Sequence, residues 1–286
     1  MKRLIVNADD LGADEGRNEG IFEAIRAGVV TSASILPNGP ALGHALQGIR
    51  TGGFEKVSFG VHLNLTEGKP LSHDVELLTG QDGDFPGKAV AHRLLVRTGD
   101  GRLGAAVAHE ADRQITVLLE AGMPLSQIDG HQHIHVFPAV IGPVLDVAIH
   151  HGIRWMRIPD EPVHGTGAGI PGNLLEEARF FSDLGRAARG RLAGTGIRAS
   201  AHFRGLLLKG RLSLETLLAA IEQLPDGLTE LMVHPGRVAA DSAEGPFASF
   251  STADREREIE ALLDPSVRRA LKQSGVVLTN YREVDR

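Results

Sequence analysis

The sequence predicts a distorted (β/α) barrel, similar to a TIM barrel, and three observations favour this fold class. About eight short apolar or β-branched segments recur along the chain, and amphipathic helical patterns separate them. Alternating strands and helices are typical of a parallel sheet. The length of 286 residues suits one large barrel. A doubly wound open sheet is the alternative, but no glycine-rich nucleotide-binding fingerprint follows the first strand.

The predicted strands are the segments in which apolar and β-branched residues cluster. They span Arg3–Ala8, Val29–Leu36, Val57–Leu63, Gln127–Gly130, Arg154–Ile158, Ile197–Phe203, Thr229–Val233 and Val276–Leu278. Helices are predicted where apolar residues recur at helical spacing, at Glu19–Ala27, Ala105–Ala121, Val140–His150, Leu212–Leu224 and Thr252–Leu263. A further helix at Asn173–Leu192 is less regular, because Gly185 and Gly190 interrupt its pattern.

Two segments rich in Gly, Asp and Pro are predicted as loop insertions within a single domain that spans residues 1–286. They lie near residues 66–101 and 237–251, and each follows the carboxyl end of a predicted strand. Because that end of a barrel carries the active site, these insertions are candidates for its walls or lids. The alternative interpretation is that they are long surface loops without a role.

The composition limits the classes of function. The net charge of -6 and the lack of a concentrated basic face disfavour nucleic acid as a partner. With no cysteine, any metal must be held by His, Asp or Glu, and the chain has 13 histidines. No segment reaches the length of a membrane span or of a signal-peptide core, so we expect a cytoplasmic protein.

Carboxylates and imidazoles follow several predicted strands at their carboxyl ends. They are Asp9, Asp10, His62, Asp129, His131, His133, His135 and His234. Each residue alone is weak support, since a single histidine near a strand end is more often structural. A parallel barrel gathers these ends on one rim, however, and the set together predicts a mononuclear metal site. The sequence HQHIH further predicts three imidazoles on one side of an extended segment.

Hydrolytic metal sites explain why two aspartates would stand side by side. Such a metal takes about three protein ligands and keeps one position open, which a carboxylate and two imidazoles satisfy. The metal lowers the pKa of its water, and a second, free carboxylate can accept the proton. One residue of the Asp9–Asp10 pair would then bind the metal, while the other would act as base.

Five stretches together resemble a known family. NADDLG, GVHLNLTEGKP, IDGHQHIHVFP, RWMRIPDEP and ELMVHPG occur in this order, and the resemblance extends from Arg3 to about Glu283. It points to the YdjC-like (ChbG/HpnK) carbohydrate deacetylases. The resemblance implies a barrel related to polysaccharide deacetylases and one divalent metal ion, Mg²⁺ or Zn²⁺. It also implies removal of the acetyl group from an N-acetylated sugar, such as a chitooligosaccharide.

The resemblance also implies roles for individual residues. Asp10, His62 and His131 match the metal ligands of the family, and Asp9 matches its catalytic base. His234 falls where related deacetylases have a histidine that can protonate the departing amine. The weaker candidates for substrate binding are Asn38, Asn64, His133, Arg157 and Asp160. Packing under a loop is an equal alternative for His133, and Arg157 is also a candidate for orienting the base.

Three other functions stay open at this point. The same ligands would serve a metal-dependent hydrolase of an ester, another amide or a phosphoester. A sugar-binding relative without turnover is the second, although the intact Asp9–Asp10 pair disfavours it. A nucleic-acid or scaffold protein is the third, and the acidic charge disfavours it. A small carbohydrate is the expected partner. A homodimer is expected only because barrels often pair, with no residue pattern behind it.

Overall fold

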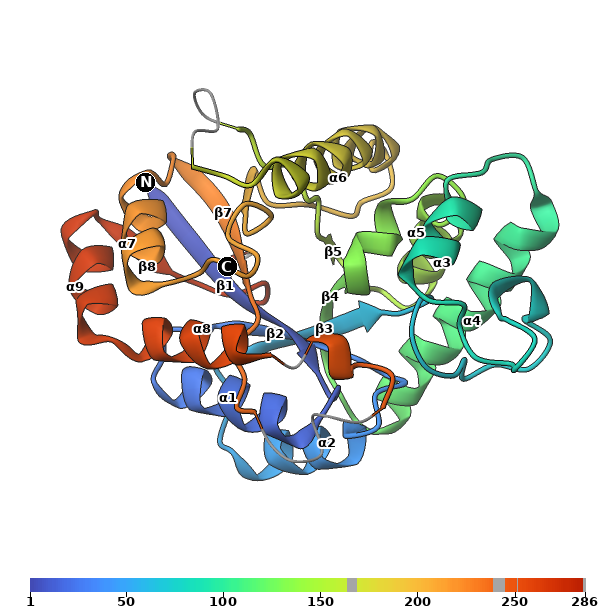
Figure 1. The fold of residues 1–286 in the computed structure, drawn as a ribbon, viewed down its shortest axis with the longest axis horizontal. Helices are drawn as coiled ribbons and strands as arrows, with labels where there is room; N and C mark the ends of the chain where they lie inside the picture. The colour runs from blue at the N-terminus through green and yellow to red at the C-terminus, as the bar shows by residue number, and fades with distance from the viewer. Residues whose placement is uncertain (164–168, 239–244, 251, 285–286) are drawn as a thin grey trace.

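Eight parallel strands form one curved sheet in the computed structural model, which describes residues 1–163, 169–238, 245–250 and 252–284 (Figure 1). The strands are β1 (Lys2–Leu11), β2 (Ser32–Ile35), β3 (Ser58–Leu63), β4 (Leu125–Gly130), β5 (Trp155–Met156), β6 (His202–Arg204), β7 (Gly227–Val233) and β8 (Val276–Leu278). Their order is β5-β4-β3-β2-β1-β7-β6, and β8 pairs with β1. All eight predicted strands are confirmed, with shifted ends.

The barrel is distorted at two positions. On the side of β1 away from β7, residues Lys2–Leu4 pair with β8, whereas β2 begins its pairing only at Asn7. The two ends of the sheet meet through an isolated parallel bridge between Trp155 and Arg198. The fifth and sixth strands are therefore shorter than predicted, because few ladder hydrogen bonds form there.

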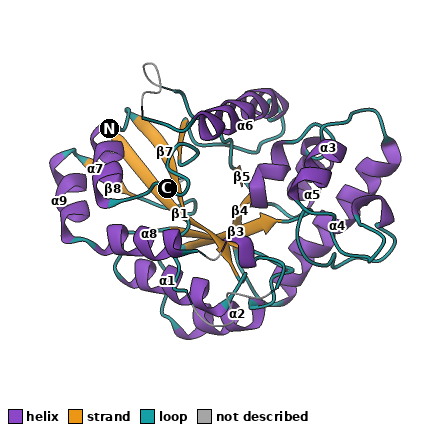
Figure 2. Cartoon of the chain, viewed as in Figure 1, coloured by secondary structure: helices purple, strands orange, loops and turns teal. Residues whose placement is uncertain are grey.

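Helices surround the sheet, as Figure 2 shows. They are α1 (Glu15–Arg26), α2 (Leu42–Thr51), α3 (Lys88–Leu95), α4 (Gly101–Glu120), α5 (Ile141–His150), α6 (Gly172–Arg191), α7 (Leu214–Glu222), α8 (Ala253–Leu263) and α9 (Pro265–Gln273). The six predicted helices are confirmed, with shifted ends, whereas α2, α3 and α9 were not predicted. Two glycines weaken the pattern of α2, and α9 follows α8 directly after the Asp264 cap.

Helices on the outside and side chains on the inside bury β1 from Leu4 to Leu11. This burial explains the apolar run Leu4–Val6 at the start of the buried part. It also means that Asp9 and Asp10 are held inside the protein, where each carboxylate requires partners. None of the helices in the described ranges has the length and hydropathy that a membrane span requires.

The first predicted insertion contains the 3-10 turn η1 (Glu76–Leu78) and α3. Buried Glu110 of α4 holds it by accepting hydrogen bonds from the backbone N–H groups of Leu71 and Ser72. The second insertion lies partly outside the described residues, at 239–244 and 251. Its described part contains η4 (Ala248–Phe250) and places Phe247 against the ring of His131, with centroids 5.6 Å apart. The single-domain assignment stays a prediction.

Candidate metal centre and active site

The two aspartates at the end of β1 are directed toward different partners by an irregularity in the strand. The pairing of β1 with β2 shifts register between Ala8 and Leu11, and Asp10 has a left-handed φ of 65°. Aspartate tolerates this conformation better than most residues, and such irregularities re-aim side chains beside active sites. Adjacent carboxylates therefore separate instead of repelling each other.

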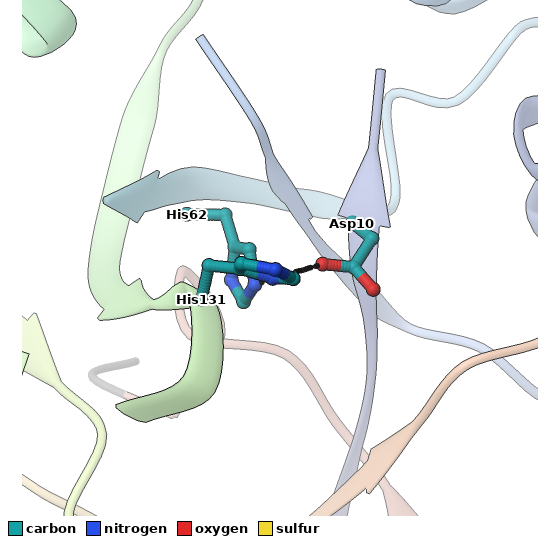
Figure 3. A group of neighbouring side chains, drawn as sticks. All are labelled: Asp10, His62 and His131. Carbon is teal, nitrogen blue, oxygen red and sulfur yellow. Dashed lines mark hydrogen bonds and ion pairs between the residues drawn. The ribbon is translucent and has the colours of Figure 1, made fainter. Parts of the chain in front are cut away.

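Asp10 forms the centre of a buried trio with two imidazoles. Its Oδ1 lies 2.8 Å from Nδ1 of His131 and 3.1 Å from Nε2 of His62 (Figure 3). Arg17 of α1 donates from Nη1 to the other oxygen at 3.0 Å. Burial raises the pKa of Asp10, but His131 and Arg17 outweigh it and hold this pKa well below its usual value. One carboxylate and two imidazoles can bind a divalent metal here.

A second carboxylate orients His62 from behind. His62 and Asp129 are register partners on β3 and β4, and His62 Nδ1 lies 2.7 Å from Asp129 Oδ1. Ser34 donates to the other oxygen of Asp129 at 2.6 Å. Burial lowers the pKa of His62, but Asp129 and Asp10 outweigh it and raise the pKa to about 10. A carboxylate behind a ligating histidine is the usual means of fixing its ring.

Asp9 is held by a two-pronged ion pair with Arg157. Both Asp9 oxygens accept from the guanidinium at 2.6 Å, and Asn7 donates to Oδ1 at 2.8 Å. Burial and the nearby charge of Asp129 raise the pKa of Asp9 in spite of Arg157. His234 Nε2 lies 3.9 Å from Asp9 Oδ2. Asp9 is therefore fixed in place beside the trio, without being part of it.

Arg157 connects three buried carboxylates through one guanidinium. Besides Asp9, it lies 2.9 Å from Asp129 and donates from Nε to Glu230 at 2.8 Å. Asp9, His62 and Asp129 also form a group with metal-binding spacing. In that group, however, both carboxylates already face the guanidinium. The trio of Asp10, His62 and His131 is therefore the better candidate for a cation.

The prediction for HQHIH is wrong in geometry. The segment forms the 3-10 turns η2 (His131–Val136), with left-handed φ values of 53° at Gln132 and 58° at His133. The three imidazoles consequently diverge. His133 packs on Phe181, with centroids 4.8 Å apart, and His135 Nε2 lies 3.0 Å from the carbonyl oxygen of Arg157. Strained backbone of this kind concentrates at functional sites.

A pocket opens above the trio. Asp9, Asp10, His62, His131, His133 and His234 all line it, so six of the predicted site residues meet in one place. At its mouth, Glu177 of α6 contacts Lys88 at 2.5 Å and Lys209 at 3.2 Å. This ion-paired group was not predicted, because its members lie far apart in the sequence.

Besides Arg157, three predicted substrate-side residues do not line this pocket. The Asn38 amide donates to the carbonyl oxygens of Glu67 and Lys69 at 3.1 and 2.9 Å. Asn64 donates to the side-chain oxygen of Asn38 at 2.9 Å, so both shape the turn after β3. Asp160 accepts from Arg186 at 2.8 Å in a partly exposed ion pair. Structural hydrogen bonds account for all three.

Several residues that support the site were missed. Arg17 and Glu230 contact Asp10 and Arg157, and neither was singled out from the sequence. A signal existed for Glu230, which is a charged residue within an otherwise apolar strand and is fully buried. Arg17 carried no comparable signal, because arginine on a helix next to glutamates is commonly exposed.

Comparisons with known proteins show which chains this one is similar to. A family model described as YdjC-like protein matches residues 3–273. A Brevibacillus brevis protein named carbohydrate deacetylase is 40% identical over 291 residues, covering 99% of both chains. A Mus musculus protein of the same name is 34% identical, covering 99% of this chain and 95% of its own. A crystal structure from Enterococcus faecalis V583, provisionally described as a cellobiose-phosphate cleavage protein, has a TM-score of 0.76 at 24% identity, covering 99% and 98% of the chains. This last likeness concerns the fold alone.

Proposed function

The chain belongs to the YdjC-like family, and from this premise we propose that it is a metal-dependent carbohydrate deacetylase. The reaction is hydrolysis of the acetamido group of an N-acetylated sugar, which releases acetate and a free amine. The observation that carries the proposal is the buried trio of Asp10, His62 and His131 with the fixed carboxylate of Asp9 beside it.

The donor set fits one divalent ion. Asp10 Oδ1, His62 Nε2 and an imidazole nitrogen of His131 already converge, and Asp129 supports His62 from behind. This set suits Zn²⁺ and, with water completing the coordination, Mg²⁺. A bound ion would polarise the acetyl oxygen, lower the pKa of a water molecule and stabilise developing negative charge on oxygen.

Asp9 acts as the base in this proposal. Arg157 prevents its carboxylate from rotating toward the trio, so Asp9 is kept available to accept a proton from the attacking water. Water oxygen bonds to the acetyl carbon, the carbon–nitrogen bond breaks, and the amine nitrogen gains a proton. That proton is the one Asp9 accepted from water, passed directly or through His234, whose Nε2 lies 3.9 Å from Asp9 Oδ2 and whose own pKa is held well below its usual value by burial and by Arg255.

The surroundings of the pocket support a substrate longer than one sugar. A second pocket shares Glu177, Lys209 and Arg255 with the first and is also lined by Asn173 and Arg211. Side chains of these types form hydrogen bonds with sugar hydroxyls. We therefore expect oligosaccharides to be bound more tightly than N-acetylglucosamine itself. Cytoplasmic location and a homodimer stay predictions.

The test is acetate release by metal-stripped protein, with Mg²⁺, Zn²⁺, Mn²⁺ or Co²⁺ added back one at a time. N-acetylglucosamine and its short oligomers are the substrates. Asp9→Asn should keep metal binding and lose about 10²–10⁴-fold in kcat, the usual contribution of a general base. Asp112→Asn is the matched control, because Asp112 pairs with His151 on the surface, away from the pocket.

Two results would contradict the proposal. Undiminished turnover by Asp9→Asn would remove Asp9 as the base. Absence of acetate with every ion and every sugar would exclude the proposed substrate class. Assays with other acylated substrates would then distinguish the two alternatives. Turnover of such a substrate indicates a hydrolase of another ester or amide, and sugar binding without turnover indicates a sugar-binding relative.

A further inference from the structure

Two charged side chains of α8 hold the main chain of His234 from both sides. Glu258 Oε2 accepts a hydrogen bond from the backbone N–H of His234 at 2.6 Å. Arg255 Nη1 donates to the His234 carbonyl oxygen at 3.3 Å and to Glu258 Oε1 at 3.1 Å. Both side chains are buried, with 1% of Glu258 and 7% of Arg255 exposed. We call this pair the α8 clamp.

The chain that follows His234 is fixed by both neighbouring helices. The backbone N–H of Gly236 donates to the Arg255 carbonyl oxygen at 3.2 Å. On the other side, the backbone N–H of Arg237 donates to the carbonyl oxygen of Gly16 in α1 at 2.8 Å. These hydrogen bonds restrict rotation of the backbone at His234. The Nε2 atom of His234 therefore stays directed at Asp9.

Fold stability alone does not explain the α8 clamp. Removing an ion pair from water costs several kcal/mol, and well-packed apolar residues often replace such pairs without loss of stability. A charge-assisted hydrogen bond to one backbone N–H does, however, restrict geometry more strongly than a neutral one. Arg255 also lines the catalytic pocket, so the α8 clamp reaches the site itself.

We infer that the α8 clamp is a positioning device for His234 and that it serves departure of the amine, not attack of water. This inference rests on the proposed function. An amide cannot expel its nitrogen as an anion, so the breaking carbon–nitrogen bond requires a proton at nitrogen. An aryl acetate releases a phenolate, which leaves with the bond electrons and needs no proton. Loosening His234 should therefore affect amides and not aryl esters.

The experiment compares Glu258→Gln, His234→Ala and the double variant in metal-loaded protein. The substrates are an N-acetylglucosamine oligomer and p-nitrophenyl acetate. Glu258→Gln keeps the size of the side chain but loses the charge that pairs with Arg255. Because a displacement of about 1 Å can cost about 10²-fold, we expect kcat on the sugar to fall by about 10–100-fold with KM unchanged. The rate on the ester should stay within about twofold, and the double variant should match His234→Ala.

Glu256→Gln is the matched control. Glu256 lies on the same helix and accepts from the backbone N–H of Val238 at 3.3 Å, so it holds the same segment beyond His234. We expect it to have the wild-type ratio of amide to ester rates. Equal losses on both substrates, an additive double variant, or the same effect from Glu256→Gln would overturn the inference.

Two further measurements apply if Glu258→Gln does not fold or if the wild type does not cleave the sugar substrate. If Glu258→Gln does not fold, Glu258→Asp retains the charge but shortens the reach to the backbone N–H of His234, and the same ratio is measured. If the wild type does not cleave sugar amides, the proposed function fails independently. NMR of labelled histidine then tests the α8 clamp, which predicts shifted His234 ring resonances in Glu258→Gln. Unchanged resonances would refute it.

Discussion

Gly20→Ala is expected to displace the segment that carries His234. Gly20 lies in α1 where the helix crosses the chain after β7. A Cβ atom at Gly20 would lie 2.4 Å from the Cα of Gly236 and 2.7 Å from its carbonyl carbon. Carbon atoms in contact are normally about 3.5–4.0 Å apart. Gly236 would therefore have to move by about 1 Å, and it is only two residues from His234.

The magnitude combines two opposing effects. Replacing a helical glycine by alanine stabilises a helix by about 1 kcal/mol. Forcing a methyl group into closely packed backbone costs about 1–3 kcal/mol, and the short distance at Gly20 places the cost near the upper end. We expect a net loss of about 2 kcal/mol and a Tm lower by about 4 °C. A shift of about 1 Å at His234 would reduce kcat by about 10²-fold.

Thermal unfolding and acetate release measure these two effects. Gly43→Ala in α2 is the control, because a Cβ there meets no atom within 4 Å and the position is exposed. That variant should gain up to about 1 kcal/mol and keep its kcat. If Gly20→Ala were as stable and as active as Gly43→Ala, the close contact of α1 with the His234 segment would not be what positions this histidine.

Three more predictions concern the supporting residues. Asp129→Asn should weaken metal binding by about 10–100-fold, because the variant lacks the carboxylate that contacts His62. Calorimetric titration measures the metal affinity, and an unchanged affinity would contradict the supporting role of Asp129. Arg157→Lys should lower kcat by at least about 10²-fold while metal binding persists, because lysine cannot form the two-pronged pair with Asp9. Wild-type turnover by this variant would refute the orienting role of Arg157. Asn38→Ala should leave KM unchanged and reduce stability by about 1–3 kcal/mol in denaturant unfolding, because its amide holds a turn; a raised KM would return it to substrate binding.

Local pattern was sufficient for the fold class and for the set of carboxylates and imidazoles at the rim, from which the family resemblance selected the trio. Strands of a buried parallel sheet are rich in apolar residues, so each strand can be predicted from a few consecutive residues. Once eight such strands alternate with helices, the carboxyl ends must share one rim. Asp10, His62 and His131 could then be expected on the same rim with the other five residues, and these three lie within metal-binding distance. The roles of these residues remain proposals.

Directions of side chains could not be read from spacing. Period-two spacing of the imidazoles in HQHIH would put them on one side of a strand. The left-handed backbone at Gln132 and His133 gives them three different sets of partners instead. Asn38 and Asn64 were candidates for substrate binding because they follow strands, and only the fold shows that their amides serve a turn.

The sequence by itself determined which side chains lie at the barrel rim, because the positions and the ends of the strands follow from local hydrophobicity. Tertiary structure alone decided how that chemistry is held. Arg157 and Asp9 are 148 positions apart, and Glu258 and His234 are 24 apart, with no shared pattern to join them. These contacts form because an unpaired buried charge is energetically costly. The packing of the sheet and helices determines which oppositely charged group or hydrogen-bond partner lies close enough to pair with it.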